Sequence, residues 1–125
     1  MIWPVEKNSI NVKFGISNHP NFPNIKIDNL GINIKVEKTQ NIKAVFDGTV
    51  TSCLEIEGMQ IAIIIEHIDF YTVYIMLNKS YVKPGDKVSK NQDIGVIEVK
   101  KNESSEIQFQ IWYKKTKLNP LDWLK

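Results

Sequence analysis

Two neighbouring stretches in the middle of the chain decide the fold: residues 61–66 (Ile-Ala-Ile-Ile-Ile-Glu) and residues 70–77 (Phe-Tyr-Thr-Val-Tyr-Ile-Met-Leu). The first is a continuous apolar run of strand length, which is typical of a strand buried on both faces. The second is rich in aromatic and β-branched residues, which favour strands. Only residues 67–69 separate them, a length suited to a hairpin. We therefore expect two antiparallel strands near the centre of a sheet.

Shorter β patterns extend in both directions from this hairpin. Apolar and polar residues alternate in residues 25–27 and 32–36, as in half-buried strands. Further strands are expected at residues 44–50, where one enters a tight turn at Asp47-Gly48, and at residues 94–97 and 107–113. Between them, residues 82–88 carry Pro84-Gly85, a turn dipeptide.

Helical periodicity is almost absent from the sequence. Two short segments could each form a single turn, residues 77–80 and residues 119–124, the second with Asn119 as cap and Pro120 at the first helical position. The chain is therefore expected to be all-β, a compact antiparallel sandwich or barrel with very little helix.

Composition limits the classes of function. The chain has 125 residues, 42% of them apolar and 24% charged, which fits one soluble globular domain. Its longest apolar run is far shorter than the roughly 20 residues of a membrane-spanning helix. Its first residues lack the pattern of a signal peptide, so the sequence by itself leaves the compartment open.

Side chains that serve common chemistries are scarce. There are two histidines, His19 and His67, and one cysteine, Cys53, which cannot form an intrachain disulfide. These are few candidate ligands for zinc, which usually takes three or four His, Cys or carboxylate ligands. The net charge is only +2, and none of the basic residues is arginine, which argues against nucleic-acid binding.

A series of short motifs follows in a characteristic order. The series is Trp3-Pro4-Val5, Phe14-Gly15, His19-Pro20, Gly31-Ile32-x-Ile34, Val45-Phe46-Asp47-Gly48-Thr49-Val50, Ile65-Glu66-His67, Tyr71-Thr72-Val73-Tyr74, Val82-Lys83-x-Gly85-Asp86, Phe109-Gln110-Ile111-Trp112 and Asn119-Pro120-x-x-Trp123-Leu124. In this order and spacing the whole chain resembles the LytM domain, the catalytic module of lysostaphin-type zinc endopeptidases that cut peptidoglycan cross-bridges. The resemblance implies a single LytM-like domain over residues 1–125, an antiparallel fold with an open groove over its central sheet.

The same resemblance implies that the catalytic residues of the family are missing. The His-x-Gly-x-Asp motif of active members, which supplies two zinc ligands, corresponds here to Asn29-Leu30-Gly31-Ile32-Asn33. Their His-x-His motif, which supplies a catalytic histidine and the third ligand, corresponds to Glu106-Ile107-Gln108, and a further family histidine corresponds to Met76. Amide oxygens are neutral and bind Zn²⁺ weakly, so we expect no metal, no cofactor and no peptidase activity.

Degenerate LytM domains form an activator class, similar to EnvC-type and NlpD-type proteins, that switches on N-acetylmuramoyl-L-alanine amidases. The chain resembles the EnvC type most. The resemblance therefore implies an exported, periplasmic or otherwise extracytoplasmic domain, excised from a longer protein, with a cell-wall amidase as its protein partner. Drift at a disused site is equally compatible with these replacements. The expected contact residues line the former active-site groove: Asn29, Asn33, Met76, Glu106 and Gln108.

Three other readings stay open. The groove could hold peptidoglycan without cutting it. Residues 82–95 resemble the hairpin of biotinyl, lipoyl and phosphocarrier domains, although the motifs that present their modified lysine or paired histidines are absent. Glu106 and His67 could belong to an unusual metal set.

The remaining polar and aromatic candidates have simpler interpretations. His67 is expected to be a structural turn residue, His19 a structural or groove-rim residue, and Cys53 a small buried apolar side chain. Tyr71, Tyr74 and Trp112 could line the groove, but aromatics on central strands are more often part of the core.

Overall fold

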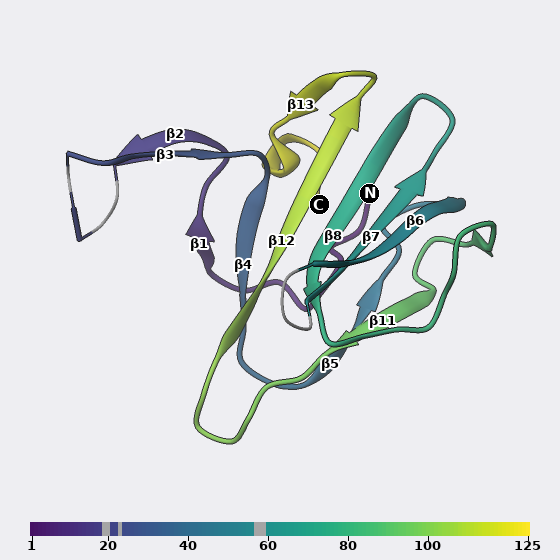
Figure 1. Cartoon of the computed structure of the whole chain (residues 1–125), viewed down its shortest axis with the longest axis horizontal. Helices are drawn as coiled ribbons and strands as arrows, with labels where there is room; N and C mark the ends of the chain where they lie inside the picture. The colour runs from purple at the N-terminus through teal and green to yellow at the C-terminus, as the bar shows by residue number, and fades with distance from the viewer. Residues whose placement is uncertain (19–20, 23, 57–59) are drawn as a thin grey trace.

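The structure is a computed structural model that describes residues 1–18, 21–22, 24–56 and 60–125, so His19 and Pro20 lie outside the described residues. Within this part of the chain, eight strands form one antiparallel sheet in the order β1-β4-β12-β8-β7-β6-β10, with β13 also paired to β12 (Figure 1). Its strands are β1 (Ile10–Val12), β4 (Ile32–Val36), β6 (Gly48–Ile56), β7 (Gln60–Glu66), β8 (Phe70–Leu77), β10 (Lys87–Val88), β12 (Ser105–Tyr113) and β13 (Thr116–Leu118).

Two smaller sheets complete the fold. The strands β5 (Gln40–Lys43), β11 (Asp93–Ile97) and β9 (Lys79–Ser80) form a three-stranded sheet in the order β5-β11-β9. The strands β2 (Gly15–Asn18) and β3 (Lys26–Asn29) form a hairpin that projects from the body at the left of Figure 1. The all-β antiparallel fold expected from the sequence is therefore confirmed.

The hydrophobic core lies between the large sheet and the three-stranded sheet. One face of the large sheet contributes fully buried side chains such as Ile34, Ile63 and Phe109, and the small sheet contributes Ile42 and Ile94. Alternation along the strands leaves the other face of the large sheet outside this core. We call it the outer face, and it carries the candidate site.

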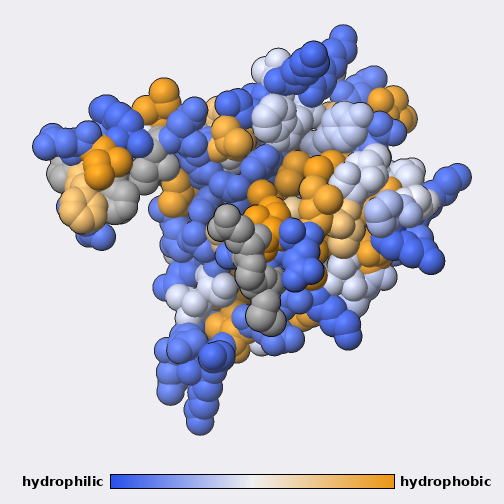
Figure 2. All heavy atoms as spheres, in the orientation of Figure 1, coloured by the Kyte–Doolittle hydropathy of each residue, from blue (hydrophilic) through white to orange (hydrophobic). Residues whose placement is uncertain are grey.

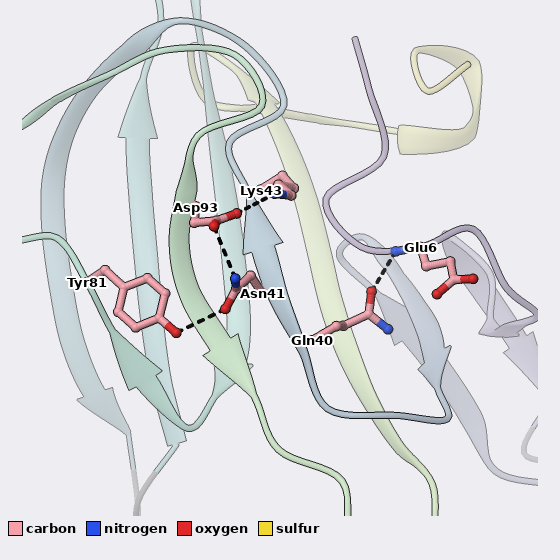
Figure 3. A network of polar contacts seen from close by, with 6 residues as sticks. All are labelled: Glu6, Gln40, Asn41, Lys43, Tyr81 and Asp93. Atoms are coloured by element: carbon pink, nitrogen blue, oxygen red, sulfur yellow. Dashed lines mark hydrogen bonds and ion pairs between the residues drawn. The ribbon is translucent and has the colours of Figure 1, made fainter.

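A polar network holds the solvent side of the three-stranded sheet together (Figure 3). Asn41 donates to Asp93 (3.0 Å) and accepts from the Tyr81 hydroxyl (2.9 Å), while Lys43 forms an ion pair with Asp93. These side chains come from β5, β11 and the segment after β9, so the network stabilises the small sheet and occupies its polar groups.

Two local expectations were wrong. Residues 77–80 do not form a helical turn: β8 ends at Leu77, and Lys79–Ser80 pair as β9 with Gly95 and Val96, because β11 offers their backbone groups sheet hydrogen bonds. The strand expected over residues 44–50 begins only at Gly48, because the Asp47-Gly48 turn precedes the strand.

The last helical expectation is confirmed as a 3₁₀ turn, η1 (Pro120–Asp122). The Asn119 side chain accepts a hydrogen bond from the Leu121 backbone N–H, as a capping residue does. Among the described residues, no helix is long and apolar enough to cross a membrane.

Candidate functional site

Strands β4 and β12 place Asn33 and Gln108 side by side on the outer face. The two residues are direct cross-strand partners, and Gln108 is also opposite Ile75 of β8. Their neighbours in sequence, such as Ile34 and Ile107, are fully buried in the core, so alternation turns the two amides outward. Figure 2 shows hydrophilic residues over β4 and β12 and apolar residues over the middle of the sheet.

Gly31 explains how β3 reaches the same place. A Cβ atom at Gly31 would lie 2.1 Å from the backbone oxygen of Phe109 and 2.8 Å from the Gln110 side chain. Only glycine therefore lets the chain cross β12 so closely between β3 and β4. The crossing brings Asn29, the last residue of β3, over β12 and next to Asn33.

The side chains of Asn29, Asn33, Glu106 and Gln108 form one hydrogen-bonded cluster. Gln108 Nε2 donates to Asn29 Oδ1 (2.6 Å) and, more weakly, to Asn33 Oδ1 (3.4 Å). Asn29 Nδ2 donates to Asn33 Oδ1 (3.0 Å), and Asn33 Nδ2 donates to Glu106 Oε1 (2.9 Å). The sequence therefore identified four residues that the structure brings together from β3, β4 and β12.

Three further residues belong to this cluster: Gln110 and Asn11, which sequence reasoning missed, and Trp112, which it named only as a possible groove residue. Trp112 Nε1 donates to Gln110 Oε1 (2.8 Å), and Gln110 Nε2 donates to Gln108 Oε1 (2.9 Å). At the opposite end, Asn11 Nδ2 donates to Glu106 Oε2 (2.9 Å). The i, i+2 spacing of Glu106, Gln108, Gln110 and Trp112 on one strand was the signal that could have found Gln110. We refer to these seven residues as the amide cluster.

The hydrogen bonds that lead from Trp112 to Glu106 all run in one direction. An indole N–H can only donate and a carboxylate can only accept. The chain from Trp112 through the amides to Glu106 therefore fixes which way each amide is turned. Bonds aligned in this way polarise and strengthen one another. Asn29 and Asn33 are only 5% and 9% exposed, so they form the floor, while Glu106 and Gln108 remain partly open to solvent.

The amide cluster does not fit a zinc ion. Its donors at the three converging positions are amides, which are poor substitutes for imidazole and carboxylate. Each of these amides already uses its oxygen and an N–H within the cluster. Among the described residues, no group of three or more His, Cys, Asp or Glu side chains is placed to hold a metal ion.

Met76 lies in a bulge of β8 and forms no part of the amide cluster. Ala62 pairs with Ile75 and Ile61 pairs with Leu77, so Met76 has no partner on β7. Its φ of 86° is unusual for a residue with a side chain, and such bulges redirect side chains at functional sites. Met76 is half-buried, and it directly follows Ile75, the β8 residue that lies opposite Gln108 of β12.

An apolar depression of about 330 Å³ lies beside the amide cluster on the outer face, lined by Thr51, Ile64, Tyr71, Val73, Trp112 and Lys114. Trp112 and Tyr71 are cross-strand partners here and are not core residues. The Tyr71 hydroxyl donates to Glu66 (2.7 Å), and this bond raises the pKa of Tyr71. Tyr74 does belong to the core, and burial raises its pKa to about 12.

His67 is buried in a structural hydrogen-bond chain away from the amide cluster. Its Nδ1–H donates to the Asp47 backbone carbonyl (2.6 Å), since a carbonyl can only accept. Its Nε2 then accepts from the Thr72 hydroxyl (2.8 Å), and its ring stacks on Phe70. Burial lowers the pKa of His67, so the neutral form fits this setting. Cys53 is half-buried and packs against the core.

Comparison with known proteins agrees with this architecture. The pattern of peptidase family M23 matches residues 28–120, most of the chain. No curated protein matches the chain in sequence.

Several solved structures have the same fold. A chain of the SpoIIQ–SpoIIIAH pore-forming complex is 24% identical with a TM-score of 0.78, and the match covers 99% of this chain and 90% of that one. The catalytic domain of lysostaphin from Staphylococcus simulans is 19% identical with a TM-score of 0.72, covering 93% and 91%. A zinc-containing peptidase from Vibrio cholerae is 20% identical with a TM-score of 0.75, covering 93% of this chain and 37% of that chain.

Proposed function

This chain belongs to peptidase family M23, and we propose that it is a non-catalytic member that acts by binding a protein partner through the outer face. The amide cluster is the observation that carries this proposal. Three amide side chains converge where the family resemblance places zinc ligands, and they are bonded to one another. A site of neutral amides has no means to activate water as a metal-bound site does.

The partner that we propose is a cell-wall amidase, which the domain would activate. The groove would bind a segment of the amidase that otherwise covers the amidase active site. Binding would shift the amidase from a state with a covered active site to one with an open active site. The similarity to a chain of a two-protein complex supports the idea that such a domain binds proteins. Action on the cell wall would require an extracytoplasmic location.

The five groove residues have different parts in this proposal. Asn29 and Asn33 are too buried to form much of an interface, so they would hold the floor in place. Glu106, Gln108 and Met76 are partly exposed and would contact the partner. Methionine adapts its shape to apolar surfaces, and the amide and carboxylate can accept hydrogen bonds at their free lone pairs.

The proposal of binding is tested with Gln108→Lys, which places a bulky charge in the groove. We expect purified domain to stimulate release of dye-labelled peptidoglycan by the amidase, and Gln108→Lys to reduce this stimulation at least about tenfold, because a buried unpaired charge at an interface costs more than 1.4 kcal/mol. Asn41→Lys, on the three-stranded sheet, is the matched control and should stimulate normally. Full stimulation by folded Gln108→Lys would show that the partner binds elsewhere.

The absence of catalysis is tested separately. Purified domain with added Zn²⁺ is incubated with cross-linked peptidoglycan, and released peptides are measured by mass spectrometry. We expect none above a boiled control, because the converging side chains are amides. Metal-dependent release would contradict the non-catalytic proposal.

A second candidate function is binding of peptidoglycan itself. The partly exposed Trp112 and Tyr71 next to Gln110 favour it, because sugar rings stack on aromatic side chains beside amide groups. Co-sedimentation with purified sacculi, compared with capture by an immobilised amidase, separates the two. Binding to sacculi that is lost in Trp112→Ala, without capture by the amidase, would favour this candidate.

A further inference from the structure

The outer edge of β6 is largely uncovered in the described part of the chain. Strand β10 pairs only with Gly48 and Thr49, and the preceding loop bonds Val50 through Gly85 and Asp86. On its other side, β6 pairs with β7 as far as Ile56. Residues 52–56 therefore have a row of backbone groups that face no other strand. We call this segment the open edge.

Apart from the charged Glu55, the open edge lacks the features that normally protect such strands. Edge strands of monomers are usually short, bulged, covered, or carry lysine or proline. Residues 52–56 read Ser-Cys-Leu-Glu-Ile, and the register irregularity of β6 lies before them, between Val50 and Ser52. Leu54 and Ile56 are 53% and 37% exposed. An unprotected edge with exposed apolar side chains is a template for another strand.

We propose that the open edge binds the open edge of a second copy of this chain, antiparallel, about a two-fold axis at Leu54. In an antiparallel pair related by such an axis, one residue lies opposite its own copy. Leu54 is the middle residue of the open edge, so all of residues 52–56 find partners within it. Ser52 then faces Ile56 of the second copy, and Cys53 faces Glu55.

The other registers are less favourable. Centring the pair on Glu55 would place two carboxylates directly opposite each other, which is destabilising. Centring it on Cys53 would place Ile56 opposite Val50, whose outward N–H and C=O are already bonded to the loop at Gly85 and Asp86. Centring on Leu54 opposes two apolar side chains and no like charges. This self-complementarity favours a second copy over a strand of another protein.

The dimer has a geometric consequence for binding. The two-fold axis is perpendicular to the sheet, so the sheets of both copies join edge to edge and their outer faces lie on the same side. Two amide clusters would then face one partner surface, which increases apparent affinity for a bivalent partner. The dimer itself does not depend on the proposed function.

Disulfide trapping tests the register directly. In a Cys53→Ser background, Leu54→Cys is oxidised at micromolar protein concentration. Residues directly opposite in an antiparallel pair have Cα atoms about 4.5–5.5 Å apart, a separation that suits a disulfide. We expect most of this variant to become a cross-linked dimer. Lys87→Cys in the same background, on neighbouring β10, is the control and should cross-link at least about tenfold more slowly.

Sedimentation equilibrium tests whether the dimer forms without the cross-link. We expect the unmodified chain to show a concentration-dependent monomer–dimer equilibrium, and Leu54→Lys to weaken it at least about tenfold, since lysine is a protective edge residue. Leu54 is exposed, so this variant should keep its circular dichroism spectrum. A chain that stays monomeric to hundreds of micromolar, equal cross-linking at positions 54 and 87, or an unchanged dimer in folded Leu54→Lys would each overturn the proposal.

Discussion

Asn33 occupies the centre of the amide cluster. It accepts hydrogen bonds from Asn29 and Gln108 and donates one to Glu106, so it connects β3, β4 and β12 through a single side chain. A buried amide in such a position is favourable only while all its partners are present. Substitution of a single residue of this cluster should therefore change the free energy of unfolding measurably, whichever partner the domain binds.

Replacement of Asn33 tests this point. Asn33→Ala removes, in a nearly buried place, the acceptor of the shortest Asn29 Nδ2 hydrogen bond and the Asn33 donor to Glu106, which costs about 1–3 kcal/mol. We expect the free energy of unfolding in urea to fall by that amount. Asn11→Ala, which removes one exposed hydrogen bond to the same carboxylate, should cost less than about 1 kcal/mol. An equal loss of unfolding free energy in the two variants would show that Asn33 contributes no more to stability than Asn11 at the edge of the cluster.

His67 gives the fold a predictable dependence on pH. Burial lowers its pKa in the folded state below the ordinary value of 6.5. Between these two pKa values the unfolded chain binds more protons than the folded chain, so stability rises with pH. The full contribution is present above about pH 6.5, the pKa of the unfolded chain, and is lost progressively as the pH falls from there through the lower pKa of the folded state.

Urea unfolding at several pH values between 5 and 8 measures this effect. We expect the free energy of unfolding to decrease below about pH 6.5, and the decrease to become smaller in His67→Gln, which keeps a polar side chain but does not titrate. His19→Gln is the control for general histidine effects. An identical pH profile for the unmodified chain and His67→Gln would show that His67 does not cause the pH dependence of stability.

At the scale of elements, the crossing of the β3–β4 connection over β12 forms the site. The crossing depends on Gly31, where any Cβ would overlap the Phe109 carbonyl oxygen. Because this contact is with backbone, it cannot be relieved by moving a flexible side chain. The same crossing brings Asn29 and Asn33 within hydrogen-bond distance of each other.

Gly31→Ala should therefore be strongly destabilising. We expect a loss of more than about 2 kcal/mol, since overlap with backbone forces the strands apart. Gly85→Ala is a useful comparison because Gly85 has a φ of 97° but open space around its Cβ, so only the conformational cost of about 1–2 kcal/mol applies. Thermal unfolding of both variants ranks them. A smaller loss for Gly31→Ala than for Gly85→Ala would argue against the close crossing.

At the scale of the whole molecule, the fold brings three amide side chains from β3, β4 and β12 together at one point. The polar atoms of Asn29, Asn33 and Gln108 lie 2.6–3.4 Å apart. Ligand atoms around a tetrahedral zinc ion are about 3.4 Å apart, given zinc–nitrogen bonds of about 2.1 Å. We therefore expect zinc-binding side chains at these three positions to reach a common metal ion.

The triple variant Asn29→His, Asn33→Asp and Gln108→His tests this geometry. We expect it to bind about one zinc ion per chain, measured by elemental analysis after dialysis, because two imidazoles and a carboxylate form a common zinc site. The unmodified chain treated identically is the control. We expect no peptidase activity from the variant, since Glu106 and Met76 remain where the family resemblance places catalytic histidines. No zinc above the control would show that the spacing is not retained.

Some parts of this molecule could be predicted from its residues because they are local. The strands at residues 32–36 and 61–66 and the cap at Asn119 all depend on neighbours in sequence, and the structure confirms these elements. The prediction of a helical turn at residues 77–80 was wrong because β11, a strand distant in sequence, supplies the hydrogen bonds there. Pairing between distant strands is not visible in a local pattern.

The same distinction between local sequence and long-range pairing applies to the candidate site. The sequence by itself determined the fold class, and through the order of its motifs the four residues Asn29, Asn33, Glu106 and Gln108. Only the tertiary structure decided that these side chains bond to one another, that Gln110, Trp112 and Asn11 extend their cluster, that Tyr71 lies outside the core and Tyr74 inside it, and that one edge of β6 is open. The physical reason is that side-chain identity and periodicity are written along the chain, whereas burial and hydrogen-bond partners depend on which strands the fold brings together.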